Sequence, residues 1–398
     1  MNQLVIKDLI ARQKSGFALQ QEFYLSSEVF EQDVENIVLK SWILVGHQSQ
    51  ISEVGEFFVS KIAGESIIVV RSDEQSINAL INVCRHRGSR VCLESEGRAS
   101  RFVCPYHAWT YDLDGKLQGA PRVMDSLDAS EYPLKRAKLE NLHGMLFVNF
   151  DPQADFASVA NELGDALAPY DLKTAKIAHR QSYEIEANWK LAVENFCECY
   201  HCLPAHREYS VAHSLARPEK VDAALLDEVM GRAASCGLSA KIFDVSFDSK
   251  EAVGSDRYFG RYPLLKGHVT GSRDGKAVAP LLGSIKGYDG GASDFQIGAF
   301  SYGLAYCDHV VLYRFIPMSQ GMTECEVIWL VRADAEEGSD YQLDNLTWLW
   351  DVTTVADKRI IQDNSRGVES RFYEPGPFTP MEYYTEQFTK WYLKVLTG

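Results

Sequence analysis

The sequence has no excess of positive charge, no long apolar run and no leader-like beginning. Its 398 residues include 40 Lys and Arg against 55 Asp and Glu, a net charge of −15. This charge argues against nucleic acid or an anionic membrane as the main partner. No stretch reaches the roughly 18 apolar residues that a membrane-spanning helix needs, and charged residues interrupt the apolar positions near the N-terminus. We therefore expect a cytoplasmic protein with no membrane contact.

The cysteines do not form a disulfide-like pattern. There are nine, an odd number, and several are close to His. In a chain without a signal peptide, such residues more often bind metal or stay reduced. Cys197, Cys199 and Cys202 form a C-x-C-x-x-C run. We expect these three to be free thiols that pack as small apolar side chains, rather than ligands of a metal.

Three segments with different patterns follow one another along the chain. Residues 1–38 have apolar residues three to four positions apart, which predicts helices. Residues 39–155 contain short β-rich runs broken by Gly, Asp and Ser, which predict a small antiparallel β domain. Residues 156–398 mix helices and strands, with a long loop at 250–293 and a C-terminal helix that ends at Gly367. The predicted fold class is therefore α+β.

Two Cys-His pairs lie in the β-rich segment, and we expect them at the tips of two hairpins. Cys84 and His86 form one pair and Cys104 and His107 the other, with 17 residues between the pairs. Two Cys and two His could hold a structural zinc ion. The usual zinc pattern puts both Cys before both His, whereas each pair here has one of each. That arrangement suits a Rieske 2Fe–2S cluster, with the two Cys on one iron and the two His on the other.

The residues around these pairs make the pattern specific. C-R-H-R-G and C-P-Y-H-A-W resemble the Rieske domain of the Rieske non-haem iron oxygenases. The resemblance implies a small antiparallel β Rieske domain over residues 39–155. It would precede a larger catalytic domain over residues 156–398, with a curved antiparallel sheet flanked by helices. Residues 1–38 would pack on the catalytic domain.

A second metal site is expected around E-N-F-C-E-C-Y-H-C-L-P-A-H. His201 and His206 are five residues apart and would lie on different faces of a straight helix, but Pro204 can break the helix and let both rings converge. Non-haem Fe(II) that activates O₂ usually has two His and one carboxylate as ligands. The family's pattern implies Asp357, on the C-terminal helix, as the carboxylate. Two nearby acids remain as alternatives: Asp351 and Asp363.

Glu198 distinguishes this chain from most of the family, which has Asp at that position. The context E-C-Y-H-C resembles the branch that acts on choline, glycine betaine, carnitine and stachydrine. The resemblance implies that Glu198 accepts hydrogen bonds from His201 and from His107 of the partner subunit, so that it couples the two iron centres. The neighbouring Asn195 also matches the family and is a second candidate catalytic residue. The alternative is a neutral exchange of Asp for Glu.

The resemblance implies the terminal oxygenase of a Rieske system, which uses O₂ to hydroxylate and demethylate a small quaternary or tertiary ammonium compound. The sequence has no G-x-G-x-x-G dinucleotide loop and no C-x4-C-x2-C ferredoxin motif. A separate NAD(P)H-dependent flavin or ferredoxin reductase is therefore the expected partner. The family also implies a homotrimer or a trimer-based hexamer. The alternatives are an aromatic-ring-hydroxylating dioxygenase, an electron carrier and a zinc-stabilised binding protein.

Aromatic residues of the catalytic segment are candidates for holding the substrate. A quaternary ammonium group has no N–H to donate, so aromatic faces suit it best. Each of these residues can equally pack the core. The candidates are Tyr302, Tyr306 and Tyr209, followed by Tyr313 and Phe315 on the next predicted strand.

Overall fold

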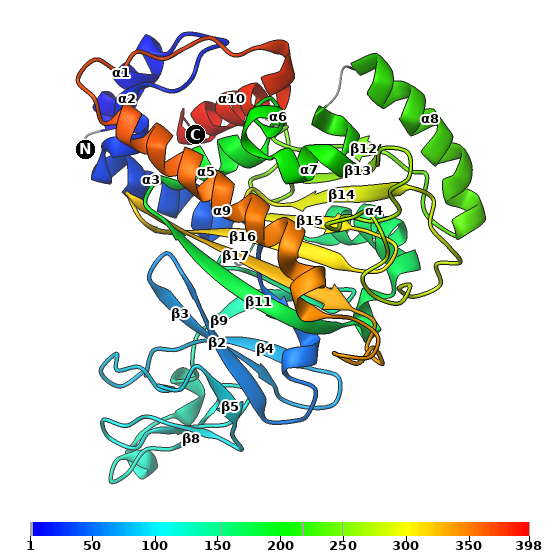
Figure 1. The fold of residues 1–398 in the computed structure, drawn as a ribbon. Coiled ribbons are helices and arrows are strands. Elements are labelled where there is room, and N and C mark those ends of the chain that lie inside the picture. Colours follow the sequence, from blue (N-terminus) through cyan, green and yellow to red (C-terminus); the bar gives the residue numbers. More distant parts are fainter. Residues whose placement is uncertain (1–2, 152, 217–218, 249, 398) are drawn as a thin grey trace. The chain divides into compact units, whose positions relative to one another are not determined.

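The computed structural model describes residues 3–151, 153–216, 219–248 and 250–397. The predicted segments also include residues 1, 2, 152, 217, 218, 249 and 398, which lie outside the described residues. The chain divides into two compact units (Figure 1). The small unit, residues 44–154, is inserted into the chain of the large unit, which takes the residues up to 43 and those from 155 onward. Separate β-rich and mixed units confirm the α+β fold class.

Two sheets form the small unit. The central strand β3 has the β-branched run of E-S-I-I-V-V-R and is buried on both faces. The larger sheet has the strand order β1 (Ile43–His47), β10 (Met145–Asn149), β9 (Arg136–Leu142), β4 (Ile77–Ile81), β3 (Glu65–Arg71), β2 (Glu56–Ile62) and β5 (Glu96–Arg98). The smaller sheet has the order β6 (Phe102–Val103), β7 (Thr110–Tyr111) and β8 (Leu117–Gly119).

Seven described strands form one antiparallel sheet in the large unit. Its central strands β16 and β17 are buried over most of their length, as expected for a sheet that is covered on both faces. The strand order is β11 (Lys176–Ile185), β17 (Met322–Val331), β16 (Val310–Ser319), β15 (Ser301–Ala305), β14 (Gly291–Ile297), β13 (Arg257–Pro263) and β12 (Phe243–Asp244).

Strand β13 corrects the prediction of a continuous loop over residues 250–293. The strand is R-Y-F-G-R-Y-P, and its two Arg and its Gly obscure any apolar pattern. Both guanidinium groups are buried because each has an acidic partner: Arg257 pairs with Glu162 and Arg261 with Asp289. A strand with such buried ion pairs cannot be recognised from hydrophobic periodicity.

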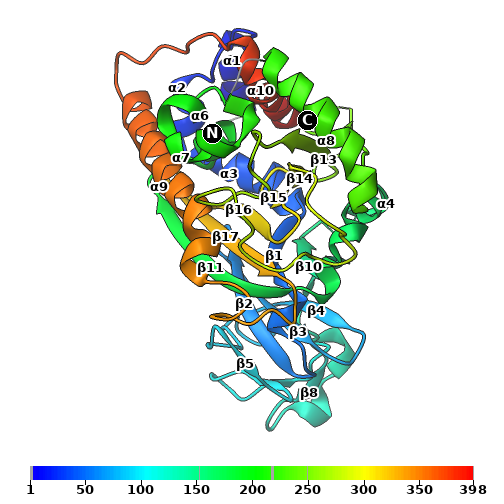
Figure 2. The same ribbon diagram turned by 45° about the vertical axis from the view of Figure 1, so that its right-hand side comes forward.

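Helices surround the sheet of the large unit (Figure 2). Both α5 and α9 contact its strands and each other, and α9 runs on to Val368, one residue beyond the predicted end. The C-terminal helix α10 packs against the N-terminal helices. The three helices named above are α5 (Trp189–Phe196), α9 (Leu343–Val368) and α10 (Tyr383–Thr397). The other helices of the unit with eight or more described residues are α1 (Gln3–Arg12), α3 (Ser27–Asn36), α4 (Ala157–Leu167) and α8 (Glu219–Cys236).

A buried ion pair joins both ends of the chain to helix α5 (Trp189–Phe196). The Lys190 ammonium lies 2.5 Å from the Asp33 carboxylate of α3, and neither side chain is exposed to solvent. Asp33 also accepts hydrogen bonds from Trp189 Nε1 at 3.1 Å and from Tyr392 of α10 at 2.8 Å. These contacts fix the helix that leads into the candidate site.

The two points where the chain leaves and re-enters the large unit are close together. Trp42 Nε1 donates to the Asp155 carbonyl at 3.0 Å, and the Trp42 ring packs on Phe156 with centroids 4.9 Å apart. The insertion is therefore closed at its base by contacts that belong to the large unit.

Candidate functional site

Both Cys-His pairs of the small unit lie in turns closed by backbone hydrogen bonds. Cys84 N–H donates to Ser89 O and Cys104 N–H to Trp109 O, each at 2.8 Å. The Cys104 turn joins β6 to β7 and is a hairpin tip, as predicted. The Cys84 turn follows β4, whose partners are β3 and β9, so it is not the tip of a hairpin.

The thiols and the imidazoles of these pairs have opposite environments. Cys84 and Cys104 are 3% and 2% exposed and belong to the core of the small unit, whereas His86 and His107 are exposed. The two imidazole rings lie 4.6 Å apart, and His86 stacks on Trp109 at 4.9 Å. Buried thiolates and exposed imidazoles are a donor set that suits a two-iron cluster with one iron facing solvent.

The spread of these four donors fits a single zinc ion poorly. Among the described residues, only one set brings three potential metal-binding atoms within 4.8 Å of one another, and it is not in the small unit. Ligands of one tetrahedral zinc lie less than about 4 Å apart. A cluster whose ligands are shared between two irons needs no such close approach.

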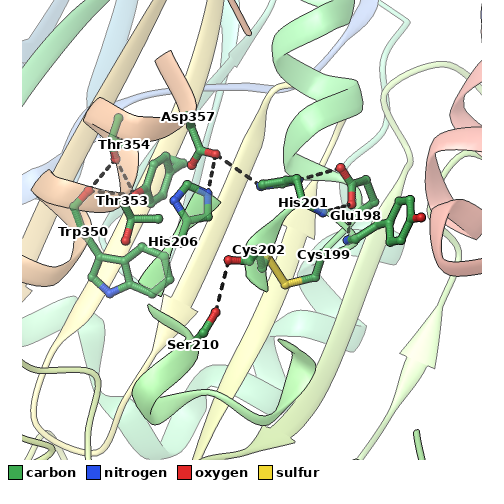
Figure 3. Close-up of polar contacts among 12 residues, drawn as sticks. Glu198, Cys199, His201, Cys202, His206, Ser210, Trp350, Thr353, Thr354 and Asp357 are labelled. Carbon is green, nitrogen blue, oxygen red and sulfur yellow. Dashed lines mark hydrogen bonds and ion pairs between the residues drawn. A yellow bond between two sulfur atoms is a disulfide. The ribbon is translucent and has the colours of Figure 1, made fainter. Parts of the chain in front are cut away.

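The set that does converge is His201, His206 and Asp357 in the large unit (Figure 3). Nε2 of His206 lies 2.8 Å from Asp357 Oδ1, and Nε2 of His201 lies 3.3 Å from the same oxygen. His206 is buried, while His201 and Asp357 are 18% and 22% exposed. Two imidazole nitrogens and one carboxylate oxygen that meet in this way are the donor set of a non-haem iron site.

The chain around this set is broken into short helices. After α5, residues 197–201 are non-helical, and α6 (Cys202–Ala205) and α7 (Arg207–Ala212) follow. Pro204 does not break the helix, contrary to the prediction, because it lies in the first turn of α6, where its missing N–H costs no hydrogen bond. The breaks occur on either side of α6. They place His201 and His206 at its two ends, with ring centroids 5.1 Å apart.

Of the three acids considered on α9, the structure brings only Asp357 to the two His. Asp351 instead accepts a hydrogen bond of 2.6 Å from Tyr183. Asp363 forms an exposed ion pair with Arg366 at 2.8 Å. The three lie on one helix, so its rotation relative to the sheet decides which of them reaches the site.

Glu198 holds His201 in a defined orientation. Its Oε1 lies 2.6 Å from His201 Nδ1, and its Oε2 accepts from the backbone N–H groups of Tyr200 and His201. Nδ1 therefore carries a proton that it donates to Glu198, and Nε2 faces Asp357. Burial lowers the pKa of His201, but the hydrogen bonds that it donates to Asp357 and Glu198 outweigh burial and raise the pKa to about 9. Asn195 is half-buried on α5 and makes no hydrogen bond to the described site residues.

Cys199 and Cys202 form a disulfide, contrary to the expectation of free thiols. The bridge spans His201, and Cys202 O also accepts a hydrogen bond of 3.1 Å from Ser210 (Figure 3). Cys197 stays free, and burial raises the pKa of its thiol. The C-x-x-C spacing of Cys199 and Cys202 is the sequence signal for this bridge.

The three candidate substrate residues separate into two groups. Tyr209 stacks on His213 at 4.0 Å, and the fully buried Tyr306 lies 2.7 Å from His213 Nε2 through its hydroxyl. Tyr302 belongs elsewhere, since its ring lies 4.4 Å from that of Phe196 at the end of α5. Tyr209 and Tyr306 therefore have partners within the core.

Phe196 is a residue that sequence reasoning missed. Its ring contacts those of Tyr302, Tyr313 and Phe315, with centroids 4.4 to 5.6 Å apart. Among these four rings Phe196 alone is only partly buried. We call this group the aromatic cluster. It borders the candidate iron site, because the Tyr313 hydroxyl lies 2.8 Å from Thr354 Oγ1, one turn before Asp357 on α9.

The donor set of the small unit suits an iron–sulfur cluster, and the separate set of two His and one carboxylate suits a mononuclear iron. Two family models match the chain: the Rieske [2Fe-2S] domain over residues 41–133, and the ring hydroxylating alpha subunit (catalytic domain) over residues 172–398. The chain therefore belongs to the Rieske-type ring-hydroxylating oxygenase alpha subunits. The predicted family, enzyme class and iron cofactors are confirmed.

Similar proteins support this assignment along the whole chain. A glycine betaine monooxygenase oxygenase subunit of Pseudomonas aeruginosa is 33% identical over 97% of this chain and 90% of its own length. A carnitine monooxygenase oxygenase subunit of Acinetobacter baumannii is 37% identical over 50% of this chain and 55% of its own. A crystal structure of the quaternary ammonium Rieske monooxygenase CntA shares the fold, with a TM-score of 0.73, 22% identity and 98% coverage of both chains.

Within the described residues, no helix combines the length and the apolar character that a membrane crossing requires.

Proposed function

We propose that this oxygenase subunit hydroxylates an N-methyl carbon of a small quaternary or tertiary ammonium compound. The observation that carries the proposal is the convergence of His201, His206 and Asp357 beside the aromatic cluster. The names of the similar proteins, which act on glycine betaine and carnitine, support the same substrate class.

His201, His206 and Asp357 would hold the iron and leave positions free for O₂ and substrate. The bound iron supplies the activation of O₂. The protein's part is to direct Nε2 of both imidazoles at the metal. For His201, Glu198 fixes the orientation of the ring by accepting a hydrogen bond of 2.6 Å from Nδ1. Asp357 supplies the negative charge that favours a divalent cation.

The reaction balances with two electrons from outside the chain. A group R₃N⁺–CH₃ reacts with O₂, two electrons and two protons to give R₃N⁺–CH₂OH and water. The hydroxymethyl product then loses a proton, and its C–N bond breaks to release R₃N and formaldehyde. Formaldehyde is therefore formed in equal amount to the O₂ consumed.

The aromatic cluster would bind the methylammonium group. A cation over an aromatic face gains about 0.5–2 kcal/mol per ring, more when the site is desolvated. Phe196 offers the only partly exposed ring of the cluster and is at the end of α5, two residues before Glu198. Among the residues predicted from sequence, Tyr302 belongs to the aromatic cluster and is retained as a candidate for contact with the substrate. Tyr209 and Tyr306 would instead pack in the core behind the site.

Electrons would enter through a Rieske cluster on Cys84, His86, Cys104 and His107, supplied by a separate NAD(P)H-dependent reductase. We further propose a head-to-tail trimer, or a hexamer built from trimers, in which the cluster of one subunit serves the iron of the next. Heterologous interfaces of this kind close into rings when the rotation permits. Glu198 would then link His201 to His107 of the partner subunit.

A reconstituted assay tests the proposal. The purified chain, a surrogate reductase and NADH are supplied with glycine betaine, carnitine, stachydrine or choline, and with benzoate and naphthalene for comparison. We expect formaldehyde release coupled to O₂ uptake with at least one methylammonium compound. Phe196→Leu should weaken binding of that compound, with Phe196→Tyr as the control that keeps an aromatic face.

The alternatives predict different results in the same preparation. Formation of a cis-dihydrodiol with no turnover of any methylammonium compound would favour a ring dioxygenase. An electron carrier would contain the cluster but no mononuclear iron. A zinc-stabilised protein would be colourless and lack labile sulfide, whereas we expect a red-brown protein with the rhombic paramagnetic signal of a reduced Rieske centre.

A further inference from the structure

Asp294 places a carboxylate on the tyrosine-rich face of the large sheet. It lies in β14, directly opposite Gly260 of β13 and Leu304 of β15. Opposed residues of neighbouring strands share a face, as do residues two positions apart in one strand. Asp294 therefore shares its face with Tyr258, Tyr262 and Tyr302.

This carboxylate lacks the partners that other buried acids of the large unit have. Asp33 pairs with Lys190, Asp289 pairs with Arg261, and Asp308 accepts from Thr270 at 2.6 Å. Within the described residues, no Lys, Arg or His pairs with Asp294. A carboxylate withdrawn from water without a cation is costly, so its charge calls for a partner that the described residues do not supply.

The Asp294 side chain is partly buried. Burial raises its pKa to about 7, and only the Phe295 backbone N–H acts in the opposite direction. The side chain nevertheless keeps part of its surface accessible, unlike its strand neighbours Ser293 and Phe295.

The charge of Asp294 reaches the aromatic residues around the candidate iron site. Burial raises the pKa of Tyr209, and the charges of Asp294 and Asp357 both raise it further. Burial raises the pKa of Tyr302 in the aromatic cluster, and contacts with Cys197 and then the charges of Asp256 and Asp294 raise it further. Asp294 and the proposed iron ligand Asp357 thus border the same region of the protein.

Resting on the proposed function, we propose that Asp294 determines specificity for cationic substrates by balancing the charge of the bound methylammonium group. A quaternary ammonium cannot donate a hydrogen bond, so the carboxylate acts through charge while the aromatic faces contact the methyl groups. A neutral analogue of the same shape would leave Asp294 unpaired in the interior. Discrimination would therefore come from the penalty on the wrong ligand as well as from attraction of the right one.

The test compares a cation with its carbon isostere. Glycine betaine and 3,3-dimethylbutyrate have the same shape, but the second has carbon in place of the charged nitrogen. We expect Asp294→Asn to weaken binding of glycine betaine by about tenfold or more, to tighten binding of the isostere, and to change KM more than kcat. Asp294→Glu should keep the preference for the cation. Asp165→Asn, at an exposed Asp that pairs with Lys241 at 3.0 Å, is the control for the loss of one carboxylate and should not change the preference.

The pH dependence gives a second readout. In the wild type, affinity for glycine betaine should fall as the pH drops through about 7, because Asp294 becomes protonated, and this fall should be absent in Asp294→Asn. An unchanged ratio of cation to isostere binding in Asp294→Asn would overturn the inference, as would a loss of preference in Asp165→Asn. If the wild type turns over no methylammonium compound at all, the proposed function itself fails.

Discussion

Replacing Asp33 with Ala should strongly destabilise the large unit, although Asp33 is far along the sequence from the proposed iron ligands. The variant would leave the Lys190 ammonium buried without a carboxylate, since neither side chain of the pair is exposed. It would also remove the acceptor of the Trp189 and Tyr392 hydrogen bonds. Breaking one partner of a buried pair costs about 3–5 kcal/mol.

This cost can be converted into a melting temperature. For domains of this size each kcal/mol lowers Tm by about 2–4 °C, so the transition of the large unit should fall by about 6–20 °C. Calorimetry on the iron-loaded protein measures it. Asp363→Ala is the control, because its ion pair with Arg366 is exposed on both sides and should contribute no more than about 1 kcal/mol.

A double variant separates the charge effect from simple loss of packing. Asp33→Leu with Lys190→Met removes both charges and fills the space with apolar groups, which is often neutral or stabilising for a buried pair. The part of the loss that is due to the unpaired charge should therefore return, while the Trp189 and Tyr392 donors still lack their acceptor. The reasoning is refuted if Asp33→Ala lowers Tm no more than Asp363→Ala does, or if the double variant is as unstable as the single one.

Three further predictions concern the candidate site and its supporting helix. Asp357→Ala should lose mononuclear iron and activity and keep the cluster spectrum, whereas Asp363→Ala should keep its mononuclear iron. The iron content per chain, measured together with the visible spectrum, distinguishes the two variants. The opposite result would assign the carboxylate ligand to Asp363, six residues further along the helix. Glu198→Gln should retain both iron centres and lose most turnover, and a normal rate of single-turnover electron transfer would contradict its coupling role. Burial raises the pKa of Glu194 from 4.5 to about 8, so the folded state holds a proton that the unfolded chain releases. The stability due to that proton should be complete below about pH 4.5 and be lost as the pH rises to about 8, by up to about 1.4 kcal/mol per pH unit; unfolding of Glu194→Gln in denaturant should show a flatter dependence over this range.

The features that sequence could predict depend on local spacing. The two Cys-His pairs, the interruption of the helix near His201 and His206 and the long helix of Asp357 all follow from residue types a few positions apart. The prediction that rested only on the helix-breaking tendency of Pro was less accurate. The helix does break near Pro204, but the Pro itself lies inside α6, because the first turn of a helix tolerates Pro.

The features that sequence could not predict depend on register and long-range packing. Strand β13 could not be predicted from hydrophobic periodicity, because its charged residues are buried in ion pairs with acids from distant segments, as Arg261 is with Asp289. The contact of Phe196 with Tyr302 requires α5 to cover a particular face of the sheet. The isolation of Asp294 can be recognised only once the neighbours of its strand are known.

The closed base of the inserted unit has a consequence for the ancestry of this architecture. Trp42 and Asp155 are 113 positions apart in the chain, yet they are joined by a hydrogen bond of 3.0 Å within the large unit. A gene for the large unit could therefore gain or lose the whole intervening module at one location, with a turn of a few residues closing the gap. The same geometry makes the module transferable in the laboratory: a redox domain of another potential could be grafted between residues 43 and 155, with the core of the host left untouched.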